Sequence, residues 1–84
     1  MEQTIMELRE EINSIDLSFI NLLERRMNLA EIIGNIKKQN NIQIRNRARE
    51  QEILNKINTA HNLAIKSIFK KIMQESRKLQ EKLK

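Results

Sequence analysis

The chain has 84 residues, a net charge of +5 and no cysteine, which fits one small domain. Charged residues make up 32% of the sequence and hydrophobic residues 39%, a balance typical of folded and not of disordered proteins. The lack of cysteine excludes disulfides, thiolate nucleophiles and cysteine metal sites. Neither a signal peptide nor an apolar run long enough to span a membrane is visible, so we expect a cytoplasmic protein with no membrane partner.

The first part of the sequence predicts one long helix. Thr4 and Glu7 have the spacing of a capping box, which opens a helix. From there apolar residues recur at alternating spacings of three and four, as in the heptads of a coiled coil. The members of this apolar seam are Ile5, Leu8, Ile12, Ile15, Phe19, Leu22, Leu29, Ile33 and Ile36. Gly34 weakens the helix locally without ending it, and the pattern stops at residues 38–41.

Two further helices are predicted, which makes the fold class all-α with three helices per chain. The second helix runs from about Arg45 to Ala60. Its inward residues are Ile53, Leu54 and Ile57. Residues 58–62 form the next break, and Asn62 is placed to cap the third helix. The apolar stripe of the third helix consists of Ile65, Ile68, Phe69, Ile72, Met73, Leu79 and Leu83.

The length of the first helix predicts an assembly. About 33 residues at about 1.5 Å each give a helix of roughly 50 Å. A compact domain of this size has a diameter of only roughly 30 Å, so the helix must project beyond it. Because the apolar seam continues along the projecting part, a second copy of the chain is the simplest cover, and we expect a homodimer.

Six polar residues stand where the helical stripes would place apolar ones. They are Arg26 and Lys37 on the first helix, Arg49 and Glu50 on the second, and Ser76 and Gln80 on the third. Any one of them alone is most simply a snorkelling side chain or a residue that sets helix register. Together they place three cations near a core in which Glu50 is the one internal carboxylate. Since an uncompensated charge near a core is costly, an anionic ligand is the natural missing partner.

The same residues exclude several kinds of catalysis. Ser76 has no inward histidine to activate it, because the single histidine, His61, falls in a predicted turn. The sequence shows neither a cluster of metal ligands nor a glycine-rich phosphate loop, so we expect no metal and no cofactor. Arginines suited to carboxylates, with lysine and glutamine as donors, favour a reaction that needs electrostatic stabilisation and little proton transfer.

These positions belong to motifs that resemble the all-α class of chorismate mutases. The motifs are Leu8-Arg9-x-x-Ile12-x-x-x-Asp16, Glu24-Arg25-Arg26-x-x-Leu29-Ala30-x-x-Ile33-Gly34-x-x-Lys37, Arg45-x-x-x-Arg49-Glu50 and Ile72-Met73-x-x-Ser76-x-x-x-Gln80. They follow one another in order along most of the chain, and their combination is specific. The resemblance implies a single chorismate mutase domain over residues 1–84 and an intertwined homodimer with two shared active sites. It implies an isomerase that converts chorismate to prephenate in the shikimate pathway, towards phenylalanine and tyrosine.

The resemblance also implies which residues bind the two carboxylates of chorismate. Arg9 from the partner chain, Arg26 and Arg49 would hold them. Ser76 would assist. Paired arginine forks fix planar carboxylates well, which suits a dianion that must be held in a strained conformation.

The remaining roles concern the two other oxygens of the substrate. Lys37 and Gln80 would donate to the ether oxygen, which gains negative charge as the C–O bond breaks. With Arg26, these are the residues that the resemblance makes catalytic. Glu50 would bind the substrate hydroxyl, helped by the backbone near Asn46. Many relatives carry aspartate at position 46. Asparagine departs from that pattern, so the contact that the resemblance implies here is one through the main chain and not through the side chain.

Three alternatives stay open at this point. The same fold and a similar dianion would suit an isochorismate pyruvate-lyase, although Glu50 and the full set of site residues favour the mutase. A basic helical dimer could instead contact nucleic-acid phosphates through Lys78, Lys82 and Lys84, but the near-absence of aromatic residues opposes base stacking, and we expect no nucleic-acid partner. A pure coiled-coil dimerisation module would leave the inward polar residues unexplained.

Overall fold

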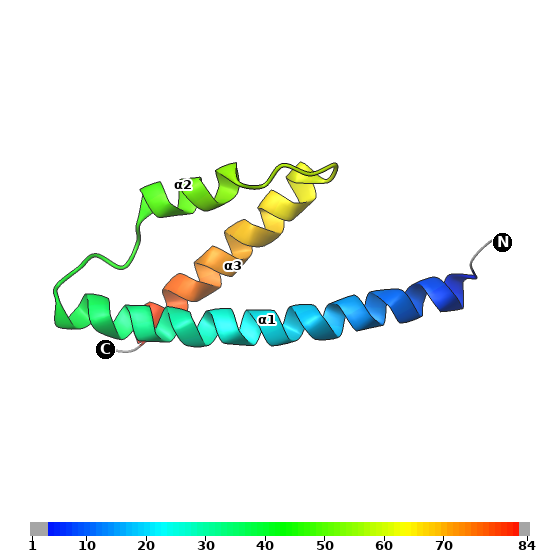
Figure 1. Cartoon of the computed structure of the whole chain (residues 1–84). Helices are drawn as coiled ribbons and strands as arrows, with labels where there is room; N and C mark the ends of the chain where they lie inside the picture. Colours follow the sequence, from blue (N-terminus) through cyan, green and yellow to red (C-terminus); the bar gives the residue numbers. More distant parts are fainter. Residues whose placement is uncertain (1–3, 83–84) are drawn as a thin grey trace.

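The structure of the chain, a computed structural model, describes residues 4–82 and is all-helical in that range (Figure 1). The helices are α1 (Ile5–Gln39), α2 (Arg47–Asn55) and α3 (Asn62–Lys82). Leu83 and Lys84, used in the sequence predictions above, lie outside the described residues. Within residues 4–82 no helix is long and apolar enough to cross a bilayer, and the cytoplasmic location stays a prediction.

Helix α1 begins at the predicted cap. The backbone N–H of Glu7 donates to the Thr4 hydroxyl at 3.1 Å, which confirms the Thr4 half of the capping box. The helix ends at Gln39, after which Asn41 adopts a positive φ of 53° and turns the chain away. Its 35 residues make α1 the longest element, and the molecule extends 58 Å along its longest axis.

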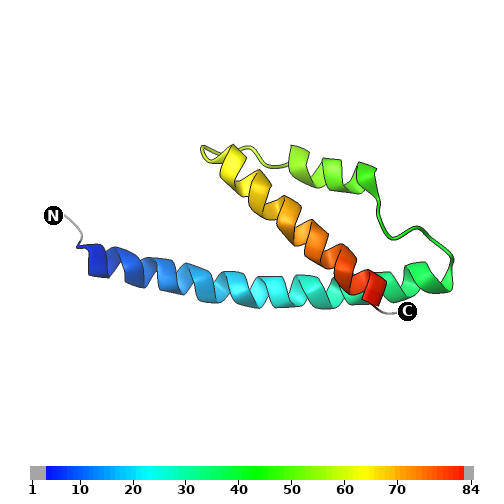
Figure 2. The same cartoon turned by 180° about the vertical axis from the view of Figure 1, so that it is seen from behind.

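The buried core lies where α3 crosses the C-terminal half of α1. Figures 1 and 2 show from both sides that α3 runs obliquely to α1 and meets it near the end of both helices. Ala30 and Gly34 are the buried residues of α1, and Ile72 and Met73 are the buried apolar residues of α3. Ala30 and Gly34 lie one turn apart on the same face of α1. They are the two smallest residues of this face, so α3 can approach α1 closely.

The closest approach of the two helices occurs at Gly34. A Cβ atom at this position would lie 2.9 Å from the Gln80 Cγ and 3.0 Å from the Gln80 Cα and Cβ. The Cα belongs to the backbone, so a larger residue at position 34 forces α3 itself to shift. Gly34, interpreted from the sequence as a local weakness of the helix, is therefore a packing requirement.

We expect Gly34→Ala to destabilise the fold although alanine is the better helix former. Overpacking costs about 1–3 kcal/mol, whereas the gain in helix propensity is about 1 kcal/mol. Thermal unfolding followed by circular dichroism at one fixed protein concentration should therefore show a lower midpoint. The neighbouring exposed Asn35→Ala is the matched control and should leave the midpoint unchanged or raise it. A Gly34→Ala protein more stable than Asn35→Ala would contradict the packing argument.

Helix α2 is shorter than predicted at both ends. The side chain of Asn46 caps it, since Asn46 Oδ1 accepts the backbone N–H of Arg49 at 3.0 Å, so the helix begins after the predicted Arg45. It ends at Asn55, and the predicted end at Ala60 was wrong. After Asn55 the backbone N–H groups bond three residues back instead of four, which tightens and ends the last turn.

The prediction that Asn62 caps α3 was also wrong. Asn62 is the first residue of the helix, and its Oδ1 accepts the backbone N–H of Thr59 at 2.5 Å. The side chain therefore stabilises the preceding turn and not the first turn of the helix. His61 lies in this turn, as predicted.

Among residues 4–82, the N-terminal half of α1 packs against neither α2 nor α3. Helix α1 contacts α3 through its C-terminal half, and Figures 1 and 2 both show its first half projecting beyond the other helices. The seam residues of the first half keep 41–69% of their surface exposed, and they are Ile5, Leu8, Ile12, Ile15, Phe19 and Leu22. A contiguous apolar stripe of this kind is unusual on the surface of a monomeric protein.

Candidate active site

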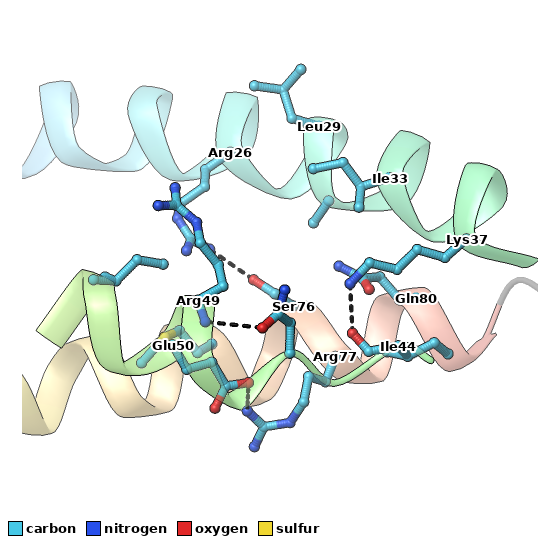
Figure 3. Close-up of a pocket in the computed structure, with 14 residues that line it drawn as sticks. Arg26, Leu29, Ile33, Lys37, Ile44, Arg49, Glu50, Ser76, Arg77 and Gln80 are labelled. Atoms are coloured by element: carbon cyan, nitrogen blue, oxygen red, sulfur yellow. Dashed lines mark hydrogen bonds and ion pairs between the residues drawn. The ribbon is translucent and has the colours of Figure 1, made fainter. Parts of the chain in front are cut away.

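A cavity of about 430 Å³ lies between the C-terminal half of α1, the start of α2 and the C-terminal half of α3 (Figure 3). Its polar lining residues are Arg26, Lys37, Asn46, Arg49, Glu50, Ser76, Arg77 and Gln80. Its apolar lining residues are Leu29, Ala30, Ile33, Ile44, Ile53 and Met73. The structure therefore brings together in one cavity every site residue expected from the sequence except Arg9.

Arg26 and Ser76 form a polar link between α1 and α3. Arg26 Nη1 donates to the Ser76 hydroxyl at 2.8 Å, and that hydroxyl donates in turn to the Ile72 carbonyl at 2.9 Å. Ser76 is buried at 7% exposure, so its position is fixed by packing and by these bonds. Its hydroxyl consequently orients the Arg26 guanidinium towards the cavity.

A second guanidinium approaches Arg26 from the opposite wall. Arg49 projects from α2 and forms an exposed ion pair with Glu52, with 2.8 Å between Nη1 and Oε1. Burial lowers the pKa of Arg26 below its usual value, and the neighbouring Arg49 cation lowers it further. An arginine nevertheless stays charged. An anion bound between the two guanidinium groups would offset both effects.

Lys37 and Gln80 lie together at the other end of the cavity (Figure 3). Lys37 Nζ donates to the Ile44 carbonyl at 2.6 Å, which fixes the ammonium group beside the loop that precedes α2. Gln80 is buried at 9% exposure, and its Oε1 has no hydrogen-bond partner. No side-chain hydrogen bond within residues 4–82 fixes this amide, so packing holds it in place. A lysine ammonium group and a buried amide therefore lie together at this end of the cavity.

Glu50 is the one carboxylate that lines the cavity, and it is held by two arginines. Its Oε2 accepts from Arg77 Nη1 at 2.5 Å, and its Oε1 accepts from Arg45 Nη2 at 3.3 Å. Sequence reasoning missed Arg77 as a lining residue. The helical spacing could have indicated it. Phe69, Met73 and Arg77 are spaced by four residues, so they share one face of the helix.

The two remaining predicted residues differ in placement. Asn46 lines the cavity, and its side-chain oxygen is occupied in capping α2, which agrees with a main-chain role towards a ligand. Arg9 lies on the projecting half of α1, 17 residues before Arg26, and does not line the cavity. At about 1.5 Å per residue, this separation is roughly 25 Å along the helix.

The charges of the cavity define what it can hold. Four cations, Arg26, Lys37, Arg49 and Arg77, surround one carboxylate, Glu50, and the Glu50 charge is matched by Arg77. Arg49 pairs with Glu52, an exposed residue that does not line the cavity, whereas Arg26 and Lys37 have no carboxylate partner among the described residues. The planar forks of Arg26 and Arg49 suit carboxylates. Among the described residues no cluster of three histidine, cysteine, aspartate or glutamate side chains is placed to hold a metal ion. The described residues form an all-helical protein with a cavity whose excess of positive charge suits a small anion.

Comparison with known proteins supplies the family. Residues 8–81 match the family described as chorismate mutase type II. The chain belongs to this family, which confirms the resemblance seen in the sequence motifs.

Two curated relatives carry the same name in different organisms. The chain is 44% identical over 55 residues to the bifunctional chorismate mutase/prephenate dehydratase of Aquifex aeolicus (strain VF5), which covers 66% of this chain and 15% of that protein. It is 36% identical over 86 residues to the bifunctional chorismate mutase/prephenate dehydratase of Buchnera aphidicola subsp. Acyrthosiphon pisum (strain APS), covering 95% of this chain and 22% of that protein. The chain thus spans less than a quarter of the length of these relatives.

A solved structure shares the fold over its whole length. It is a conserved hypothetical protein from Pyrococcus furiosus, which superposes with a TM-score of 0.81 at 38% sequence identity. The similarity covers 95% of this chain and 99% of that one. The arrangement of one long and two shorter helices therefore occurs in a solved protein of about the same size.

Proposed function

We propose that this chain is a chorismate mutase domain that rearranges chorismate to prephenate in aromatic amino-acid biosynthesis. The observation that carries the proposal is the cavity, in which helices α1, α2 and α3 together bring cations and hydrogen-bond donors to one place in a member of this family. The reaction is pericyclic: within one molecule an ether C–O bond breaks while a C–C bond forms, and no proton, electron or leaving group is exchanged. Such a step needs positioning and electrostatic stabilisation, and it requires neither a general base nor a nucleophile.

The first task of the site is to bind and restrain the dianion. Arg26 and Arg49 face the cavity from opposite walls and would each take a carboxylate, with Ser76 keeping Arg26 in place. Holding both carboxylates brings the two reacting carbons together, which converts a rare conformation of the substrate into the bound one. Glu50 would accept a hydrogen bond from the ring hydroxyl and so fix the orientation of the ring.

The second task is to stabilise the charge that develops on the ether oxygen. Lys37 has three N–H donors, of which one goes to the Ile44 carbonyl, so the others are available to the ligand. The Gln80 amide is placed beside it. Donors aimed at an oxygen that becomes more negative bind the transition state better than the substrate, and this difference is what raises kcat.

We further propose that the active unit is a homodimer with two shared sites. The support is the exposed apolar seam on the projecting half of α1, which a second long helix would cover. In such a dimer the projecting half of one chain reaches the cavity of the other and would bring Arg9 to it. All the remaining residues of that site would then come from a single chain.

Chorismate disappearance, followed by ultraviolet absorbance, tests the proposed reaction. The product should convert to phenylpyruvate in acid, which identifies it as prephenate. The same protein should be given isochorismate in parallel. Faster release of pyruvate from isochorismate than turnover of chorismate would replace the mutase by the lyase, and no turnover of either would remove the enzymatic proposal.

The charged groups of the site predict a flat pH profile. Burial and Arg49 both lower the pKa of Arg26, so they favour its neutral form, and any loss of activity begins at the alkaline end. Arginine and lysine side chains ordinarily remain charged through the neutral range, and Gln80 does not titrate. The single histidine lies outside the cavity. We therefore expect kcat at saturating chorismate to be nearly constant from about pH 6 to about pH 8.5. A bell-shaped profile centred near neutrality would reveal an acid–base pair and contradict this mechanism.

A further inference from the structure

Arg77 is the polar cavity residue to which neither the sequence motifs nor the proposed reaction assigns a role. Its guanidinium lies 2.5 Å from Glu50 Oε2, and the two side chains keep only 22% and 16% of their surface exposed. The second partner of Glu50, Arg45, is farther away at 3.3 Å and is 41% exposed. Since sheltered, short charge-assisted bonds are the strong ones, Arg77 is the main partner of Glu50.

The same bond attaches α2 to α3. Helix α2 has nine residues and no buried residue, so packing alone fixes it weakly. Among the side-chain hydrogen bonds of residues 4–82, the Arg77–Glu50 bond is the one that joins these two helices. Helix α2 carries Arg49 and Glu50 into the cavity, so the place of both depends on this attachment.

We propose that Arg77 is a positioning residue, which holds the Glu50 carboxylate in the orientation that receives the substrate hydroxyl. The inference rests on the proposed function. A carboxylate has about four lone-pair positions. Arg77 and Arg45 each take one of these, so the others are left for a ligand hydroxyl. In this arrangement Arg77 acts through Glu50 and does not itself bind a carboxylate of the substrate.

A double-mutant cycle on kcat/KM separates these two roles of Arg77. Arg77→Met removes the charge and keeps the length of the side chain, and Glu50→Gln removes the carboxylate. Glu50→Gln weakens the proposed bond to the substrate hydroxyl and should lower kcat/KM about 10- to 100-fold, the usual effect of losing a hydrogen bond to a charged group. Arg77→Met should lower it by a similar or smaller factor, because Arg77 acts through Glu50. If Arg77 acts through Glu50, the double variant should be no worse than Glu50→Gln alone. If Arg77 binds the substrate directly, its replacement will cost the same factor in both backgrounds, and the proposal is overturned.

Two further measurements keep the test decisive. Lys78→Met is the matched control, because Lys78 is the next residue of α3, is exposed and pairs with Glu75 outside the cavity, so it should leave kcat/KM within about two-fold of the unchanged protein. If circular dichroism shows that Arg77→Met does not fold, Arg77→Lys takes its place in the cycle. Lysine keeps the charge but not the planar fork, so Arg77→Lys should also lower kcat/KM. In the Glu50→Gln background it should lower kcat/KM no further.

The unchanged protein distinguishes the two proposals. Turnover of chorismate by it, together with additive losses in the cycle, would overturn the role of Arg77 and leave the proposed function intact. Absence of turnover in the unchanged protein would overturn both.

Discussion

Replacing Lys37 by alanine is expected to lower kcat/KM for chorismate about 100- to 1000-fold, the usual effect of removing one preorganised donor to a developing charge. Lys37 is held in place by the Ile44 carbonyl, so its ammonium group needs no reorganisation when the ether oxygen gains charge. Gln80 stays as a second donor, but a neutral amide is the weaker of the two. The loss should therefore appear mainly in kcat, because the interaction forms fully only in the transition state.

The neighbouring Lys38→Ala is the matched control for this experiment. It removes the same charge from the next residue of α1, which is exposed and does not line the cavity, and should leave kcat/KM nearly unchanged. Circular dichroism should show equal helicity for both variants. If Lys37→Ala retained near-normal activity, or if both variants lost activity equally, Lys37 would not be the donor to the ether oxygen.

The long helix follows from signals that the sequence carries locally. Thr4 sets the start of α1, and the apolar repeat sets its course up to Gln39. The end of α2 could not be read in the same way. The backbone N–H groups of Lys56 and Ile57 bond to the carbonyls three residues back, and these bonds leave no mark in the apolar pattern. The Asn62 side chain does accept a backbone N–H, as a capping residue does. The N–H group belongs to Thr59 in the preceding turn and not to the first turn of α3.

The site was predictable where a polar residue interrupts an apolar stripe and not where a partner is distant in sequence. Ser76 and Gln80 interrupt the stripe of α3, and both are buried. Arg77 has the spacing of a lining residue, but its role depends on Glu50, 27 positions earlier, and no periodicity joins those two residues. The contact of Lys37 with the Ile44 carbonyl is likewise invisible, because it involves the backbone of a loop.

Arg9 separates what one chain can do from what two chains can do. Arg9 and Arg26 lie 17 residues apart on one continuous helix. At about 100° and about 1.5 Å per residue, they point about 100° apart and are separated by roughly 25 Å. Two side chains so placed cannot grip one small molecule from the same helix. If both bind substrate, Arg9 must come from the second chain of the proposed homodimer.

Complementation between two inactive variants is therefore expected. Arg9→Ala and Arg26→Ala homodimers should each be nearly inactive, because every site carries a lesion. After the two are unfolded together and refolded, half of the dimers are mixed under random pairing. In a mixed dimer one site carries both lesions and the other carries neither, as two-fold symmetry requires. Activity should then return to roughly a quarter of that of the unchanged protein.

A second mixture provides the matched control. Arg26 and Arg49 line the same cavity of one chain, so in a mixed dimer of Arg26→Ala and Arg49→Ala each site still carries one lesion. That mixture should stay as inactive as its parents, while mass spectrometry shows the same fraction of mixed dimers in both experiments. Recovery with Arg9→Ala and none with Arg49→Ala would place Arg9 in the site of the partner chain. If the mixture with Arg9→Ala also stayed inactive although mixed dimers had formed, Arg9 would not act across the dimer and the shared-site proposal would fail.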